Sequence, residues 1–308
     1  MERLRINLPH AGGNLQLKNP VLTASGTFGY GLEYTPYGNL TELGGIVTKG
    51  LSLKPRPGNP MPRIAETSCG MLNAIGLQNC GVEEFLKNCL PKLPVLDLPV
   101  IANIYAHSLD DFAELSGILA DAPGLAGLEV NISCPNVSCG GVLFGQNPRE
   151  AARVTEAVKK KAKKLPVIVK LSPNVTDITE IAKACAEAGA DMLSCINTLT
   201  GMAVDLVKRR PLLANITGGL SGPAIKPVAL RCVWQVARAV NIPVIGIGGI
   251  SSAEDALEFI MAGAYAVQIG TANFRRPDRA FTLVREIADL MDKLDIENLE
   301  SFRGSLQV

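Results

Sequence analysis

The chain has 308 residues, 47% of them apolar, so it can bury a large core and is not a disordered protein. Its formal net charge of +1 gives no electrostatic basis for binding nucleic acid or an acidic membrane surface. No apolar run approaches the roughly 18 residues of a membrane span, and the N-terminus does not resemble a signal peptide.

Cysteine and histidine usage restricts the chemistry that the chain can perform. Eight cysteines are spread along the sequence without a Cys-x-x-Cys pair, so a reduced, cytoplasmic protein is expected. With only two histidines as well, no metal is predicted, neither zinc nor an iron–sulfur cluster held by this chain alone. Acid–base chemistry must then come from Cys, Lys, Asp, Glu or Tyr.

The strands are predicted by a loose repeat. After a short N-terminal segment that is expected to be polar, eight short apolar runs follow, and four of them open with Pro-Val. Continuous rather than alternating apolar runs are typical of parallel strands buried on both faces. The predicted strands cover residues 20–22, 45–48, 99–102, 127–130, 166–169, 192–196, 243–246 and 266–269.

Helical patterns fill the gaps between these strands. The pairs Thr176-Asp177 and Ser251-Ser252 supply suitable N-cap residues for two of the helices, and glycines follow the ends of both. The stripe of apolar residues in the last predicted helix indicates that it docks on the body of the protein. The predicted helices cover residues 149–164, 177–188, 253–262 and 278–294.

Strands that alternate with helices predict an α/β fold of the (β/α)8, or TIM, barrel type, in a single domain over residues 1–308. Two insertions, at about 50–98 and 198–226, leave from C-terminal strand ends and are expected over the active-site face. A doubly wound open sheet is the alternative fold. It is disfavoured because no Gly-x-Gly-x-x-Gly follows the first strand.

Polar residues and glycines follow the predicted strands. Two lysines and three asparagines would meet at one rim and form a cationic, hydrogen-bonding pocket for an anionic, planar ligand. Any one of them could instead pair with a loop carbonyl. The strand-end residues are Ser25, Lys49, Gly50, Asn103, Asn131, Lys170, Asn197, Thr198, Gly248, Gly249, Gly270 and Thr271.

The glycines after strands seven and eight indicate a phosphate site. Loops at these two positions of a TIM barrel often bind phosphate, and glycine lets backbone N–H groups approach it. The alternative is that Gly248-Gly249 and Gly270-Thr271 only form tight turns. Lys170 across the mouth could stabilise the negative charge of a reduced flavin, so FMN would fit. A sugar-phosphate isomerase would show the same features.

The motif Asn-Ile-Ser-Cys-Pro-Asn over residues 131–136 places a thiol directly after a buried strand. Cys134 is therefore the candidate catalytic base, with Lys49 and loop N–H groups available to stabilise its thiolate. The alternative is a small buried apolar residue. The glycine-rich loop over residues 135–148 is a candidate lid; no role is assigned to Cys139, and the other cysteines are interpreted as structural.

These motifs resemble those of the catalytic subunit of class 1 dihydroorotate dehydrogenases, and most of all the NAD-linked type B form. The resemblance covers nearly the whole chain. The strongest motifs are residues 73–79, 131–137 and 248–250, supported by 48–50, 196–198, 221–222 and 269–271.

The resemblance implies oxidation of (S)-dihydroorotate to orotate in de novo pyrimidine biosynthesis, with Cys134 as the base and FMN as the hydride acceptor. The residues implied to bind FMN are Ser25, Lys49, Gly50, Asn103, Asn131, Lys170, Ile196, Gly222, Gly248, Gly249, Gly270 and Thr271. The residues implied to bind substrate are Lys49, Asn73, Ala74, Ile75, Gly76, Leu77, Asn131, Asn197 and Thr198.

The resemblance also implies a partner. Type B enzymes pass electrons to NAD+ through a separate subunit that carries FAD and a [2Fe–2S] cluster, and a homodimer flanked by two such subunits is expected. Three alternatives stay open: a type A enzyme that uses fumarate, a related dihydropyrimidine-type flavin dehydrogenase, and a phosphate-handling barrel isomerase. A non-catalytic flavin-binding scaffold would have no need of the Cys134 thiol.

Overall fold

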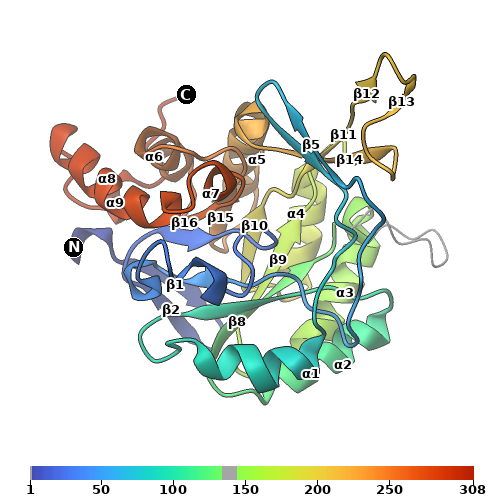
Figure 1. Cartoon of the computed structure of the whole chain (residues 1–308). Coiled ribbons are helices and arrows are strands. Elements are labelled where there is room, and N and C mark those ends of the chain that lie inside the picture. Colours follow the sequence, from blue (N-terminus) through green and yellow to red (C-terminus); the bar gives the residue numbers. More distant parts are fainter. Residues whose placement is uncertain (1, 134–143) are drawn as a thin grey trace.

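A parallel barrel forms the centre of the molecule in a computed structural model that describes residues 2–133 and 144–308 (Figure 1). All the pairings within its eight-stranded sheet are parallel, and an isolated parallel bridge from Leu22 to Gly45 joins the two end strands and closes it. Each predicted strand is present, so the (β/α)8 prediction is confirmed. In spatial order the strands are β3 (Val21–Thr23), β16 (Ala266–Ile269), β15 (Val244–Ile247), β10 (Met192–Cys195), β9 (Val167–Leu171), β8 (Leu125–Asn131), β7 (Val100–Ile104) and β4 (Ile46–Val47).

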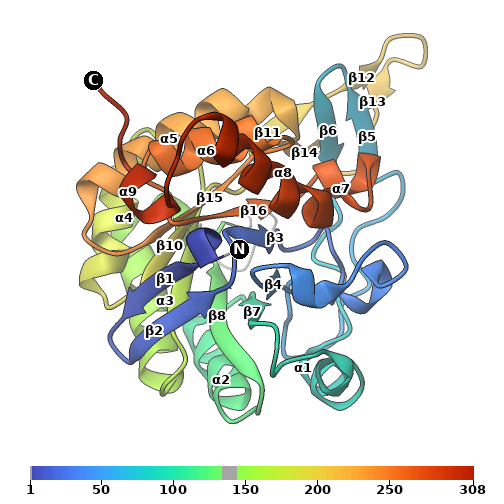
Figure 2. The same ribbon diagram turned by 90° about the vertical axis from the view of Figure 1, so that its left-hand side faces the viewer.

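Helices surround the barrel on its outside (Figure 2). Every residue of β7, β9, β10, β15 and β16 is buried, because one face packs under helices and the other fills the barrel interior. The predicted N-caps are confirmed: Asp177 accepts from Thr179 N–H, and Ser252 forms a capping box with Asp255. The helices are α1 (Val82–Glu84), α2 (Leu109–Ala120), α3 (Pro148–Lys161), α4 (Ile178–Glu187), α5 (Lys226–Ala239), α6 (Ala253–Met261), α7 (Ala272–Arg275), α8 (Arg279–Lys293) and α9 (Leu299–Phe302).

An N-terminal hairpin replaces the polar segment expected there, so that expectation was wrong. Strands β1 (Ile6–His10) and β2 (Gly13–Leu17) pair in antiparallel fashion, and their alternate apolar residues are buried. Ala11 N–H at the turn donates to Asp191 Oδ1 (3.2 Å), and Asp191 directly precedes β10. The hairpin therefore covers the N-terminal end of the barrel, in front of the strands in Figure 2.

The two insertions associate with each other. Residues 50–98 contain β5 (Ile64–Thr67) and β6 (Gly70–Asn73), and residues 198–226 contain β11 (Leu199–Met202) and β14 (Thr217–Ser221). These strands form one antiparallel sheet in the order β11-β14-β6-β5. The two insertions follow β4 and β10, and the sheet lies at the upper right of Figure 1.

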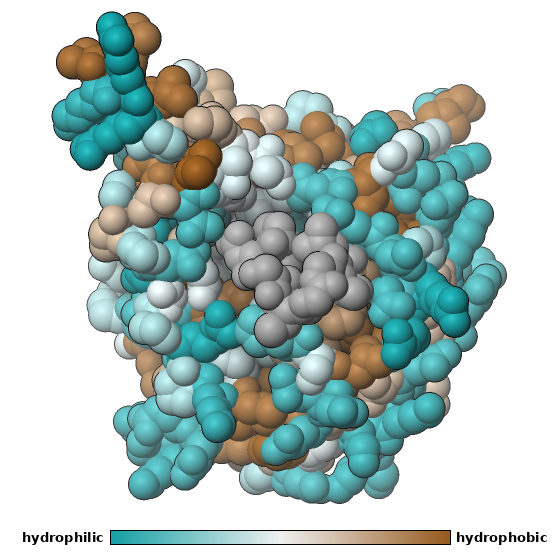
Figure 3. Space-filling model, turned by 90° about the vertical axis from the view of Figure 1, so that its right-hand side faces the viewer, coloured by the Kyte–Doolittle hydropathy of each residue, from teal (hydrophilic) through white to brown (hydrophobic). Residues whose placement is uncertain are grey.

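A short hairpin of β12 (Val204–Asp205) and β13 (Arg210–Pro211) projects from this sheet and stands away from the body at the upper left of Figure 3. Its tip combines the exposed apolar residues Leu206 and Val207 with basic residues. Among residues 2–133 and 144–308, no helix is long and apolar enough to cross a membrane.

The Thr23 side chain contributes to the contact between β3 and β4, the two strands at which the barrel closes. The N–H of Val47 on β4 donates to Thr23 Oγ1 on β3 (3.0 Å), and the Thr23 hydroxyl lies 3.3 Å from the Val47 carbonyl oxygen, to which it donates. Both residues are fully buried, so neither backbone group can turn to water instead. The Thr23 hydroxyl thus takes the place of a backbone hydrogen-bond partner between the two strands and satisfies both polar backbone groups of Val47.

Replacing Thr23 by Val keeps the shape of the side chain but leaves Val47 N–H buried without its acceptor. We expect the free energy of unfolding to fall by about 1–3 kcal/mol, measured from urea unfolding curves. Thr155→Val is the matched control, because the Thr155 hydroxyl is also fully buried but donates to the carbonyl of Ala151 within α3 and hydrogen-bonds the Cys185 thiol on α4, away from β3 and β4. Equal losses of unfolding free energy in Thr23→Val and Thr155→Val would show that closure of the barrel does not depend specifically on the Thr23 hydroxyl.

Candidate active site

A cavity of about 980 Å³ opens at the C-terminal ends of the barrel strands. It is lined by the segments that follow β3, β10, β15 and β16, by Lys170 on β9, and by the β5–β6 hairpin and β14 of the insertions. This volume suits a small-molecule ligand or cofactor. The predicted site residues in its lining are Ser25, Lys170, Ile196, Asn197, Thr198, Gly222, Gly248, Gly249, Gly270 and Thr271.

The remaining predicted residues are outside this lining. A Cβ atom added to Gly50 would lie 3.0 Å from Asn103 Oδ1 and 4.0 Å from Leu77 Cδ2, so these three segments meet. Asn131 is joined to the cavity by Asn197, whose Nδ2 donates to Asn131 Oδ1 (3.3 Å). Asn73 Nδ2 donates to the carbonyl of Gly219 across the insertion sheet (3.4 Å). Lys49, Ala74, Ile75 and Gly76 also lie outside the lining.

The glycines at one end of the cavity leave no room for side chains. Gly249 has φ +74°, and a Cβ on it would lie 2.7–2.9 Å from atoms of Lys226 and the Gly222 carbonyl oxygen. A Cβ on Gly222, where φ is +91°, would lie 2.8 Å from Gly70 Cα. Thr271 Oγ1 donates to Ser221 Oγ (2.7 Å), which joins the loop after β16 to the insertion sheet. The result is a backbone-lined cradle of the kind that accepts a phosphate.

Asp255 anchors the loop that follows these glycines. Its Oδ2 accepts from Ser251 N–H (2.8 Å), Ser251 Oγ (3.0 Å) and Ser252 N–H (3.0 Å), while Oδ1 accepts from Lys226. Burial alone would raise the pKa of the Asp255 carboxyl, but the bonds from Lys226 and Ser251 outweigh it and lower the pKa. The anionic form of Asp255 therefore stabilises the folded state.

The pKa of Asp255 is lower in the folded state than in the unfolded state. Its ionised carboxylate therefore stabilises the fold fully above the unfolded-state pKa of about 3.9. This stabilisation is lost as the pH falls through the folded-state pKa. We expect Asp255→Asn to reduce the free energy of unfolding by about 1–3 kcal/mol at neutral pH. The deficit should shrink below about pH 4. Urea unfolding at several pH values measures this.

Asp177→Asn is the control for that experiment. Asp177 also accepts hydrogen bonds at the start of a helix, but it is exposed, and Asn serves equally well at its N-cap position. A deficit in Asp255→Asn that is the same at every pH would contradict a charge-dependent role for Asp255.

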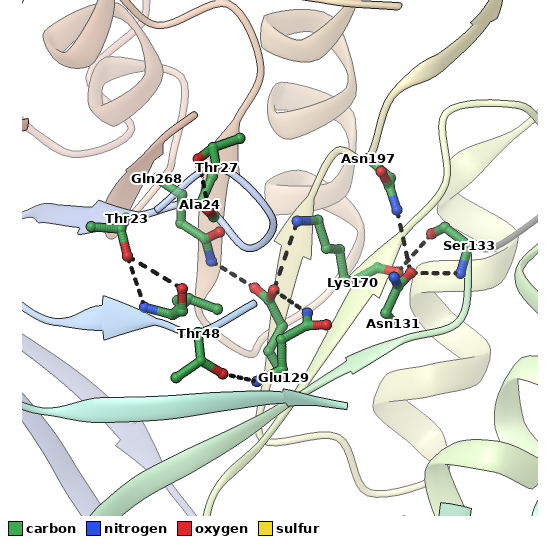
Figure 4. Close-up of polar contacts among 12 residues, drawn as sticks. Thr23, Ala24, Thr27, Thr48, Glu129, Asn131, Ser133, Lys170, Asn197 and Gln268 are labelled. Carbon is green, nitrogen blue, oxygen red and sulfur yellow. Dashed lines mark hydrogen bonds and ion pairs between the residues drawn. The ribbon is translucent and has the colours of Figure 1, made fainter. Parts of the chain in front are cut away.

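A buried polar network underlies the cavity and was not anticipated from the sequence (Figure 4). Glu129 on β8 is fully buried and accepts from Asn103 Nδ2 (2.7 Å) and Gln268 Nε2 (2.6 Å). Lys170 Nζ, which lines the cavity, lies 3.7 Å from Glu129 Oε1. The available signal was a single polar residue inside each of two apolar strand runs, 127–130 and 266–269.

The segment leading to the candidate base is held in place. Ser133 N–H donates to Asn131 Oδ1 (3.1 Å), and Ser133 Oγ donates to the Lys170 carbonyl (3.0 Å). Cys134 itself, Cys139 and the predicted lid up to residue 143 lie outside the described residues. Asn131 and Lys170, both predicted site residues, thus fix the residue that directly precedes Cys134.

The surroundings of Lys49 and Cys69 could not be predicted from the sequence. Burial lowers the pKa of Lys49, and the positive charge of Arg63 lowers it further. Cys69, interpreted as structural, is exposed at the tip of the β5–β6 hairpin and lines the cavity, together with Glu66 and Met71. The insertion that contains this hairpin was expected over the active-site face, but Glu66, Cys69 and Met71 were not named as site residues, because nothing local in the sequence shows where the hairpin docks.

A (β/α)8 barrel whose active-site rim carries glycine-rich loops after its last two strands is typical of barrel enzymes that bind a phosphate-bearing ligand. The sequence profile of the dihydroorotate dehydrogenase family matches residues 8–291. The chain therefore belongs to the dihydroorotate dehydrogenase family, and it is an oxidoreductase.

Several relatives are similar over nearly their whole length, and each is named dihydroorotate dehydrogenase B (NAD(+)), catalytic subunit. The chain is 67% identical to the protein of Solidesulfovibrio magneticus over 294 residues, 96% of each chain. It is 62% identical to that of Maridesulfovibrio salexigens over 303 residues, 98% of this chain and 99% of the relative. It is 58% identical to that of Geotalea daltonii over 294 residues, 96% of each.

Proposed function

We propose that this chain oxidises (S)-dihydroorotate to orotate in cytoplasmic de novo pyrimidine biosynthesis, with FMN held in the barrel mouth. The observation that carries the proposal is one cavity that joins the glycine cradle to Lys170, Asn197 and Thr198. It is supported by the family match over residues 8–291 and by the names of the relatives.

The residues present fit FMN. Gly222 and Gly249 line the cavity, and a side chain on either would clash with neighbouring protein atoms, so the wall there is bare backbone that a phosphate can approach. Lys170 supplies a cation at the floor of the cavity, and Asn103 Oδ1 is a buried acceptor with no partner among the described residues. FMN bound here supplies the hydride acceptor. The proposed contacts are Ser25, Lys49, Gly50, Asn103, Asn131, Lys170, Ile196, Gly222, Gly248, Gly249, Gly270 and Thr271.

The chain's own residues then bind and orient the substrate. Lys49 pairs with the substrate carboxylate, and the amides of Asn131 and Asn197, which are hydrogen-bonded to each other, reach the ring amides. Formation of the ring double bond removes a hydride from ring carbon 6 and a proton from ring carbon 5. The Cys134 thiolate takes that proton. The proposed substrate contacts are Lys49, Asn73, Ala74, Ile75, Gly76, Leu77, Asn131, Asn197 and Thr198.

The electrons leave through a partner in this proposal. The relatives are named as the catalytic subunits of NAD(+) enzymes, which supports a second subunit. We propose that the partner carries FAD and a [2Fe–2S] cluster, and that two partner subunits flank a homodimer of this chain.

The first test is anaerobic addition of dihydroorotate to the FMN-loaded chain while the flavin absorbance is followed. Rapid bleaching is expected in the wild type. Cys134→Ser should slow it by about 10²- to 10⁴-fold near neutral pH, because a serine hydroxyl is a much weaker base. Cys89→Ser is the control, since Cys89 is outside the cavity lining, and its rate should match the wild type.

Each contrary result has a distinct meaning. A yellow protein that never bleaches would exclude dihydroorotate as the substrate, and a protein that cannot be loaded with FMN would exclude the flavin. Bleaching at the wild-type rate in Cys134→Ser would exclude Cys134 as the base. Reoxidation by NAD+ only when the partner subunit is present supports the type B assignment, and reoxidation by fumarate without a partner would establish type A.

A further inference from the structure

Glu129 is a buried carboxylate that the proposed reaction does not use. It lies on β8 inside the barrel and is fully buried, and its hydrogen-bond donors come from β7 and from β16 on the opposite side of the barrel (Figure 4). It lies outside the cavity lining, whereas Lys170, 3.7 Å away, lies within that lining. The carboxylate therefore lies behind the lysine as seen from the ligand.

Packing does not account for an anion at this position. A buried charge is strongly unfavourable unless it is paired, and an apolar side chain of similar size is often neutral or stabilising in its place. Glu129 is satisfied by two amides and one ammonium, but two of those partners, Asn103 and Lys170, belong to the proposed flavin site. Glu129 thus connects the core to two side chains of the proposed flavin site.

The carboxylate also sets the orientation of both amides. An ionised carboxylate only accepts hydrogen bonds, so Asn103 and Gln268 must each present their NH2 group to it. Their carbonyl oxygens are buried and have no partner among residues 2–133 and 144–308. The Asn103 oxygen lies toward Gly50, another of the proposed flavin contacts.

We propose that Glu129 is a positioning residue that holds the Lys170 ammonium at the floor of the cavity and offsets part of its charge. It thereby sets how strongly the site favours a flavin that carries negative charge. This inference rests on the proposed function, because it concerns FMN bound in this cavity. Glu129 touches neither the flavin nor the substrate and acts through Lys170 and Asn103.

The competing explanation is that Glu129 only stabilises the fold. The two explanations differ in the direction in which removal of the Glu129 charge changes the affinity of the bound flavin for an anion. Sulfite is the probe, because its adduct with the flavin leaves negative charge on the ring. Glu129→Gln keeps the shape and removes the negative charge, so sulfite should bind about tenfold more tightly or better. Lys170→Met should bind it about tenfold more weakly, and the double variant should fall within about threefold of the wild type.

The two-electron reduction potential is the second readout. It should rise in Glu129→Gln by about 30 mV for each tenfold change in the equilibrium. Glu129→Asp retains the charge and should stay close to the wild type. Asp191→Asn is the matched control, since Asp191 is also a buried carboxylate with a lysine partner, Lys159, but lies at the opposite end of the barrel. Its sulfite affinity should be unchanged.

The outcomes are distinguishable. A wild-type chain that binds no FMN would overturn the proposed function. FMN-loaded Glu129→Gln with wild-type sulfite affinity and potential would overturn the inference alone and show that Glu129 only stabilises the fold. If Glu129→Gln does not fold, Lys170→Met is compared with the double variant, which leaves no unpaired buried charge. Tighter sulfite binding in the double variant supports the inference, and equal binding overturns it.

Discussion

Closure of the barrel is the constraint on which the site depends. In an open sheet the loops after β3 and β4 would lie at opposite edges, but the Leu22–Gly45 bridge and the Thr23 hydroxyl bring these two strands together. All eight carboxyl ends then face one rim. Lys170, Gly249 and Thr271, which are far apart in the sequence, consequently line one cavity.

The interior of the barrel is not uniformly apolar, and this gives the rim its electrostatic character. Glu129 connects β8 to β16 across the barrel and pairs with Lys170 beneath the cavity. The rim itself presents lysine, asparagine and backbone groups. An anionic ligand therefore meets a cationic surface whose charge is partly compensated from below, out of contact with the ligand.

Much of this architecture could be predicted from the sequence, because the determining patterns are local. Continuous apolar runs identify parallel strands, and the residue after each run identifies the rim. The N-terminal hairpin was equally readable, since Ile6, Leu8, Leu15 and Leu17 alternate around Gly12-Gly13, but the segment was interpreted as polar.

The parts that could not be predicted are long-range contacts. Neither insertion contains a signal that β6 will pair with β14, because that register depends on where each strand leaves the barrel. Glu129 and Gln268 were visible as polar residues in apolar runs, but their contact crosses the barrel between residues that are 139 positions apart. Cys134 stays a prediction, since it lies outside the described residues.

The pairing of β6 with β14 has a consequence for the order of folding. The cradle needs Gly222 against Gly70, so part of it forms only when segments about 150 residues apart in the chain have met. Contacts of such long sequence separation are costly in loop entropy and form late. A nascent chain can therefore assemble β7, α2 and β8 through local contacts well before Gly70 and Gly222 meet. Formation of the cradle thus reports that the two insertions have paired, which the formation of helices does not.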